Sequence, residues 1–176
     1  MFGLSWSSDQ AAAKQRFPNA APLEDHPHVL VYPLDSIADA LWKENAFCPT
    51  AICSGPGREG DQLVLNYVDG GLVAGFLRFG YGFEIIGQSS DTLSDMAMAA
   101  FARAELQQLI FEMSSRYGPP VVFTESAMRS GNWHPVGAAM FDAGADGMVH
   151  LLFGHDHSGL MGELRYQMPV TDPSGI

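Results

Sequence analysis

A chain of 176 residues with 47% hydrophobic and 16% charged side chains is long enough for one domain with a core, and short for two. Twenty acidic against nine basic residues give a formal net charge of −11, which repels phosphate backbones and anionic lipids. We therefore expect no nucleic-acid partner and no membrane partner. The carboxylates are scattered along the chain, which also argues against a mimic of DNA.

No apolar run approaches the ~18 residues of a membrane span. The first residues lack both the basic start and the continuous apolar segment of a secretory signal. Together these features predict a cytoplasmic protein.

Residues 1–27 are expected to form an N-terminal arm and an extended segment. The stretch from Ser7 to Phe17 predicts a short helix capped by Ser7 or Ser8. The apolar side chains before it need a surface to pack against, on this chain or on a neighbour. Several prolines then punctuate an extended stretch, in which residues 28–34 predict a strand.

A short helix at 36–46 and a short strand at 50–54 are expected next. Two sequence patterns in this region resemble functional motifs. Cys48 and Cys53 are five positions apart, which is the spacing of neither a zinc knuckle nor a redox pair. We interpret them as small semi-buried side chains, with a catalytic thiol paired to a distant histidine as the alternative. "GPGREG" at 55–60 has the letters of a dinucleotide fingerprint, but a strand follows it instead of the required helix. We expect no cofactor.

An antiparallel meander is predicted over residues 62–87. Two apolar strands flank the turn "DGG", and "GYG" at 80–82 is expected to turn into a third strand. Leu63, Leu65 and Tyr67 share one face of the first strand and Val64 and Val68 the other, so both faces are expected to be covered.

The strongest single element is a long helix at about 91–117. Its start carries capping and acidic residues, its apolar residues recur at helical spacing, and Gly118 followed by two prolines ends it. Phe101 and Ile110 are expected in its buried face. The helix should pack across one face of the sheet.

The rest of the chain predicts three strands and a long connection. Residues 121–124 are expected as a buried strand, 148–153 as another, and 160–170 as a strand with one wet face. Between 125 and 147 we expect an irregular segment with one short helix near 135–142, and its "DAGADG" is a turn without the ligand spacing of a calcium loop. Residues 169–176 are expected to be a flexible tail.

The candidate binding residues lie on that long connection. They are Glu125, Arg129, Asn132, Trp133 and His134. An exposed Trp-His pair is unfavourable unless it packs on the core or binds something. We weigh a structural role, contact with a ligand or partner, and acid–base work by His134 with Glu125.

The three histidines of "HLLFGHDHSG" raise the question of a metal site. Glycines at both ends of "GHDHSG" predict a hairpin tip, and His155 and His157 alone supply too few ligands for a metal. We expect no metal. A site shared with His134 is also not expected, because the connection enters strand 148–153 at one end and the tip leaves at the other.

The sequence thus predicts a single α+β domain spanning residues 1–176, with a largely antiparallel sheet. The preferred function is a non-catalytic acidic binding or regulatory protein with a protein or small-molecule partner. The alternative is a small hydrolase that uses His134 with Glu125, or a metal held by His155 and His157. We expect a homodimer whose interface includes the second face of the meander or the N-terminal arm.

Overall fold

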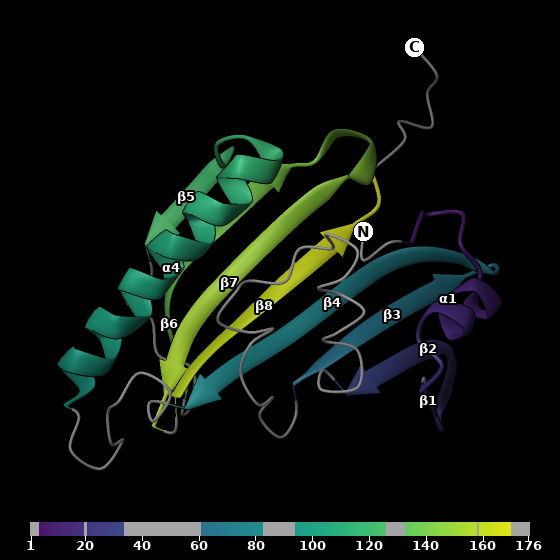
Figure 1. The fold of residues 1–176 in the computed structure, drawn as a ribbon, viewed down its shortest axis with the longest axis horizontal. Coiled ribbons are helices and arrows are strands. Elements are labelled where there is room, and N and C mark those ends of the chain that lie inside the picture. The colour runs from purple at the N-terminus through teal and green to yellow at the C-terminus, as the bar shows by residue number, and fades with distance from the viewer. Residues whose placement is uncertain are drawn as a thin grey trace.

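One antiparallel sheet of eight strands organises the protein, as seen in a computed structural model (Figure 1). The structure describes residues 4–19, 21–33, 61–82, 94–125, 133–157 and 159–169. The predicted helix at 36–46, the strand at 50–54, the cysteine pair, "GPGREG", Arg129, Asn132 and most of the predicted C-terminal tail lie outside these residues.

The described elements alternate along the chain between strands and a few helices. They are α1 (Gln10–Arg16), β1 (Ala21–Leu23), β2 (His26–Pro33), β3 (Gln62–Val68), β4 (Gly71–Gly82), α4 (Asp95–Tyr117), β5 (Val122–Glu125), β6 (His134–Asp142), the 3₁₀ turn η3 (Gly144–Asp146), β7 (Met148–Asp156) and β8 (Gly159–Gln167). The order across the sheet is β1-β2-β3-β4-β8-β7-β6-β5. Because every neighbouring pair is antiparallel and α4 packs on the sheet, the predicted α+β fold is confirmed.

The sheet consists of two meanders joined at one seam. Strands β1–β4 form the first meander and β5–β8 the second, and β4 pairs with β8 over the register Ala74↔Gln167 to Gly82↔Gly159. Figure 1 shows α4 lying across β6 and β7 of the second meander, while α1 lies beside β2 at the other end.

The two faces of the sheet differ in burial. On the face that α4 covers, alternate residues of β7 and β8 form the core, and Val149, Leu151, Phe153 and Leu164 are at most 1% exposed. The opposite face, which we call the open face, carries partly or fully exposed side chains. It consists of Gln62, Val64, Phe76, Arg78, His150, Leu152, Met161, Glu163 and Arg165. The wet face predicted for β8 is part of it.

The helix α1 forms close to its predicted position but has a different cap. Asp9, and not Ser7 or Ser8, accepts a hydrogen bond from the Ala12 N–H. Ala13 on its inner side is fully buried, and the Phe17 ring at its end meets the Tyr32 ring of β2 at 5.2 Å.

The long helix α4 begins at Asp95, where the Ser94 side chain accepts from the Ala97 N–H, and Gly118 ends it with a positive φ of 81°. Its inner face is offset from the one expected, since Phe101 and Ile110 are only partly buried. The buried residues are Met98, Ala102, Leu106, Leu109 and Met113. No helix among the described residues is long and apolar enough to cross a membrane.

Three local predictions were wrong because pairing across the sheet overrides the local pattern. "GYG" does not turn, because β8 pairs with β4 through Gly82 and the Asp61 carboxylate accepts from the Gly80 N–H. Residues near 135–142 form strand β6 and not a helix, because β5 and β7 hold both its sides. The strand at 121–124 is not buried, because β5 is the outermost strand.

The two faces of β3 differ in burial. Leu63 and Leu65 are fully buried, but Val64 is only partly buried and Val68 is 57% exposed. Among the described residues, therefore, only the α4 side of the sheet is fully covered, and cover of the second face by a partner subunit stays a prediction.

Replacement of Leu106 tests the packing of α4. Leu106→Ala should lower the free energy of unfolding by about 2–5 kcal/mol, because the side chain is 3% exposed and lies against Gly137 of β6. Phe111→Ala on the outer side of the same helix, where the ring is 69% exposed, should change it by less than about 1 kcal/mol. Denaturant melts measure both, and equal losses would contradict this packing.

Candidate functional site

Three of the predicted binding residues, Glu125, Trp133 and His134, are described, and these three do not form one cluster. Glu125 is the last residue of β5 and is exposed, Trp133 precedes β6, and His134 is its first residue. Glu125 pairs with Gly137, three positions along β6 from His134 and thus on the order of 10 Å away along the strand. His134 and Glu125 are therefore too far apart for a direct hydrogen bond. Acid–base work by the two residues together would require a group that bridges them.

His134 instead lies beside His155. The two residues are register partners of β6 and β7, and their ring centroids are 4.9 Å apart at 40°. The expectation that the connection and the histidine hairpin lie far apart was wrong, because β6 runs back along β7 and brings its start to the end of β7. Gly154 permits this approach, since a Cβ there would overlap the His134 backbone.

His155 belongs to strand β7 and not to the hairpin tip. Its side chain is 2% exposed, and its Nδ1 has no hydrogen-bond partner among the described residues. Burial lowers the pKa of His155 below its usual value, as does the neighbouring His134, while Asp156 and Asp95 act in the opposite direction. The ring is therefore neutral at pH 7.

The predicted hairpin between the last two strands is present, and it separates His155 from His157. His157 is exposed at the turn, whereas His155 is buried in the sheet. Within the described ranges, no group of three or more His, Cys, Asp or Glu residues could hold a metal ion. The alternative of a metal held by His155 and His157 thus has no third ligand there.

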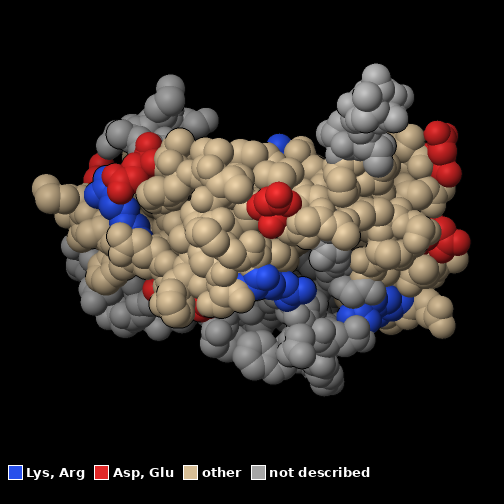
Figure 2. Space-filling model, turned by 90° about the horizontal axis from the view of Figure 1, so that it is seen from above, with Lys and Arg blue, Asp and Glu red and all other residues tan. Residues whose placement is uncertain are grey.

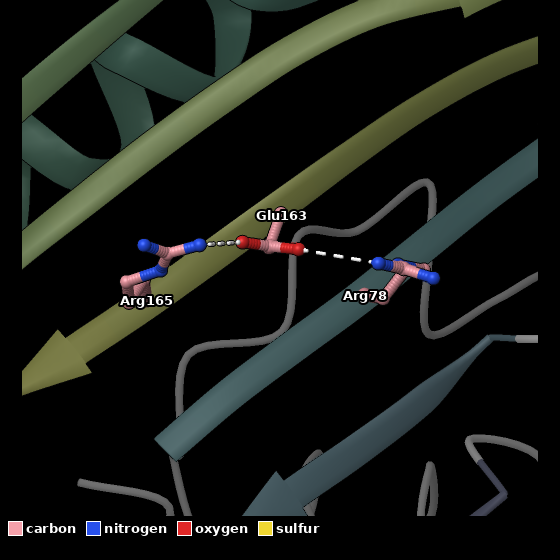
Figure 3. Close-up of polar contacts among 3 residues, drawn as sticks. All are labelled: Arg78, Glu163 and Arg165. Atoms are coloured by element: carbon pink, nitrogen blue, oxygen red, sulfur yellow. Dashed lines mark hydrogen bonds and ion pairs between the residues drawn. The ribbon is translucent and has the colours of Figure 1, made fainter. Parts of the chain in front are cut away.

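A row of three charged side chains crosses the centre of the open face. Arg165 Nη2 lies 2.9 Å from Glu163 Oε1, and Arg78 Nη2 lies 3.6 Å from Glu163 Oε2 (Figure 3). Glu163 and Arg165 come from β8, and Arg78 comes from β4 directly opposite Glu163. Sequence reasoning placed Glu163 and Arg165 on a wet face but did not select them, because Arg78 is remote in the chain.

Aromatic rings flank the row on both sides. The guanidinium of Arg165 lies over the Phe76 ring of β4, 4.9 Å from its centroid. On the other side of β8, His150 of β7 is the register partner of Arg165. Burial lowers the pKa of His150, and so does the positive charge of Arg165.

Three cavities lined by described residues share Glu163 and Arg165. Their volumes are about 240, 250 and 370 Å³. The first extends toward β5 and β6 past His150, the second covers Phe76, and the third reaches Trp133. Of the three predicted binding residues that the structure describes, Trp133 lines this surface, and its buried Nε1 has no partner among the described residues.

The charge of this surface is opposite to that of the chain. Its lining holds two arginines and one glutamate, whereas the whole sequence has twenty acidic and nine basic residues. The arginine side chains are 52% and 46% exposed and Glu163 is 21% exposed. Both guanidinium groups can therefore be reached from solvent while Glu163 holds them in place.

No protein-family model, no curated protein and no solved structure matches the chain.

Acidification should destabilise the fold through His155. The unfolded chain has the usual histidine pKa of 6.5 and the folded chain a lower one, so the unfolded state binds more protons between these two values. The melting temperature should stay level above about pH 7.5 and fall as the pH drops below 6.5. His155→Phe should flatten this fall.

The matched control is His157→Phe, which replaces an exposed histidine two positions away. It should keep the pH dependence of the original protein. If both variants melt with the same pH profile as the original protein, His155 is not the buried group that titrates.

Proposed function

We propose that the protein is a non-catalytic binding protein whose open face takes a small molecule with an apolar body and one carboxylate. The observation that carries this proposal is the row Arg78–Glu163–Arg165. Glu163 and Arg165 line all three cavities, and Arg78 lines two of them. The row supplies the anchor for the anionic end, and the surrounding strands supply apolar surface.

The preference for a carboxylate comes from the guanidinium groups. Arginine presents paired N–H donors that match the two oxygens of a carboxylate. Glu163 uses one donor group of each arginine and leaves a net charge of +1 on the row. A ligand carboxylate near Arg78 or Arg165 neutralises that charge.

The apolar body is supported by the lining beside the row. Phe76, Leu152, Met161 and Trp133 contribute apolar side chains next to the charged residues. The cavities of about 240 and 250 Å³ fall just below the range of about 300–1,000 Å³ found for small-molecule sites, and the cavity of about 370 Å³ falls within it. A short aliphatic or aromatic body suits this size.

A second candidate function is hydrolysis with His134 as general base. The contact between His134 and His155 favours it, because the buried His155 ring fixes the position of a histidine that is itself only partly buried. It ranks behind binding because the candidate partner Glu125 lies along another strand, opposite Gly137.

Two further proposals concern where and how the protein works. We place it in the cytoplasm, on the basis of its composition. We also propose a homodimer, but not through the second face of the meander, since two copies of the row would bring like charges together there. A different surface for the dimer is argued in the next subsection.

Titration with decanoate and decanol tests the binding proposal. Decanoate should quench or shift tryptophan fluorescence through Trp133, and decanol, which has the same chain without the charge, should bind more weakly. Arg165→Ala should weaken decanoate binding roughly 10- to 100-fold, because it removes a charge-assisted hydrogen bond. Calorimetry gives the affinities.

Arg103→Ala is the matched control, because Arg103 is an exposed arginine on α4 and lines none of these cavities. It should leave the affinity unchanged. Equal binding of decanol and decanoate, or equal affinities of Arg165→Ala and Arg103→Ala, would exclude carboxylate recognition by the row.

The hydrolase alternative has its own measurement. If His134 is a general base, the protein should hydrolyse activated esters such as p-nitrophenyl acetate above the rate of free imidazole, and His134→Gln should lower that rate by about 10²-fold or more. A rate that His134→Gln leaves unchanged would rule this role out.

A further inference from the structure

The outer edge of β5 pairs with no other strand among the described residues. β5 pairs with β6 on one side, from Val122↔Met140 to Glu125↔Gly137, and it is the last strand of the described sheet (Figure 1). In an antiparallel strand, alternate N–H and C=O groups point to opposite sides. Half of the backbone groups of β5 therefore point away from β6 and can pair with another strand.

The side chains of this edge are apolar and exposed. Val121 is 58%, Val122 45% and Phe123 46% exposed, and Glu125 at the end of β5 is the only charged residue of the strand. Exposed apolar strand edges promote pairing with other chains, and proteins usually block them with charge, proline or bulges.

The opposite edge of the same sheet carries such blocks. β1 has only three residues, and its central Pro22 lacks an N–H to donate. Its register with β2 shifts between Pro22 and Leu23, and Glu24 and Asp25 follow directly. The contrast between the two edges indicates that β5 is kept free for pairing.

Charge is also sparse on this side of the molecule. Figure 2 looks down on the side where β5 lies in Figure 1. The described surface there is mostly uncharged, with one acidic residue and basic groups near its middle and further acidic residues toward both ends. Two copies of a chain with net charge −11 can approach most closely where carboxylates are few.

We infer that β5 pairs with β5 of a second copy of this chain, antiparallel about a twofold axis at Phe123. This inference rests on the proposed homodimer and does not require the ligand, although Val122 and Thr124 of β5 also line the first cavity of the open face. The two sheets then join into one continuous sheet. Phe123 lies opposite the partner's Phe123, and Val122 lies opposite the partner's Thr124.

The register explains why a second copy fits this edge. Glu125 falls opposite the partner's Val121, so the two Glu125 carboxylates stand at opposite ends of the paired strands, on the order of 14 Å apart. That separation exceeds the screening length of about 10 Å at 0.1 M salt. Valine, phenylalanine and threonine are also the residue types that favour cross-strand pairing.

Light scattering on the full chain tests the interface. At micromolar concentration the protein should have twice its chain mass of 19.0 kDa, and Val122→Lys should raise the dimer dissociation constant about 10-fold or more, because it places two like charges diagonally across the joined edge on the same face of the sheet. Val68→Lys is the matched control, since Val68 is a 57% exposed valine at the end of β3. It should remain dimeric.

Cross-linking distinguishes loss of the interface from misfolding of the Val122→Lys variant. In a Cys48→Ser/Cys53→Ser background, Phe123→Cys should form an intermolecular disulfide on mild oxidation, because the twofold axis places that position opposite itself, and Val68→Cys should not. A monomeric original protein would overturn both the homodimer and this interface. A dimer that survives Val122→Lys, or that Phe123→Cys fails to cross-link, would overturn this interface alone.

Discussion

The pairing of β4 with β8 is the constraint on which the whole sheet depends. It joins two meanders that would otherwise be separate four-stranded sheets, each too open to bury its apolar face. Gly162 of β8 makes the contact possible on the core side, because a Cβ there would lie 2.5 Å from the Phe79 ring and 2.6 Å from the Phe153 ring. The centroids of the Phe79 and Phe153 rings are 6.2 Å apart.

The same seam builds the candidate site on the other side of the sheet. Glu163 follows Gly162 and therefore points to the open face, where its register partner Arg78 meets it. Neighbouring residues of β8 thus serve the two faces of the sheet, with Gly162 packed in the core and Glu163 in the charged row (Figure 3). The contact between the buried His155 and the partly buried His134 lies on the core side of the sheet, away from that row.

Local patterns predicted those parts of the fold that local contacts decide. The β3–β4 hairpin, the alternation in β8 and the end of α4 at Gly118 follow from neighbouring residues, and all three are present. The order of the strands could not be predicted, because many pairings satisfy the same apolar alternation. The misassigned strand β6 shows this, since the helix preference of its alanines is overridden once β5 and β7 pair with it. The Arg78–Glu163 contact depends on the same unknown order, and for this reason the sequence indicated Trp133 but not the row that it flanks.

The seam also governs how the chain can fold. Local hairpins close quickly, but β4 must wait for β8, which lies near the other end of the chain, and such long-range pairing slows folding. During synthesis from the N-terminus, the first meander emerges with β4 as a bare edge carrying Leu72, Leu77 and Phe79. Until Gly159–Gln167 leaves the ribosome, these residues have no final partner, and this nascent edge is exposed to aggregation. The last strand made is therefore the one that completes the core.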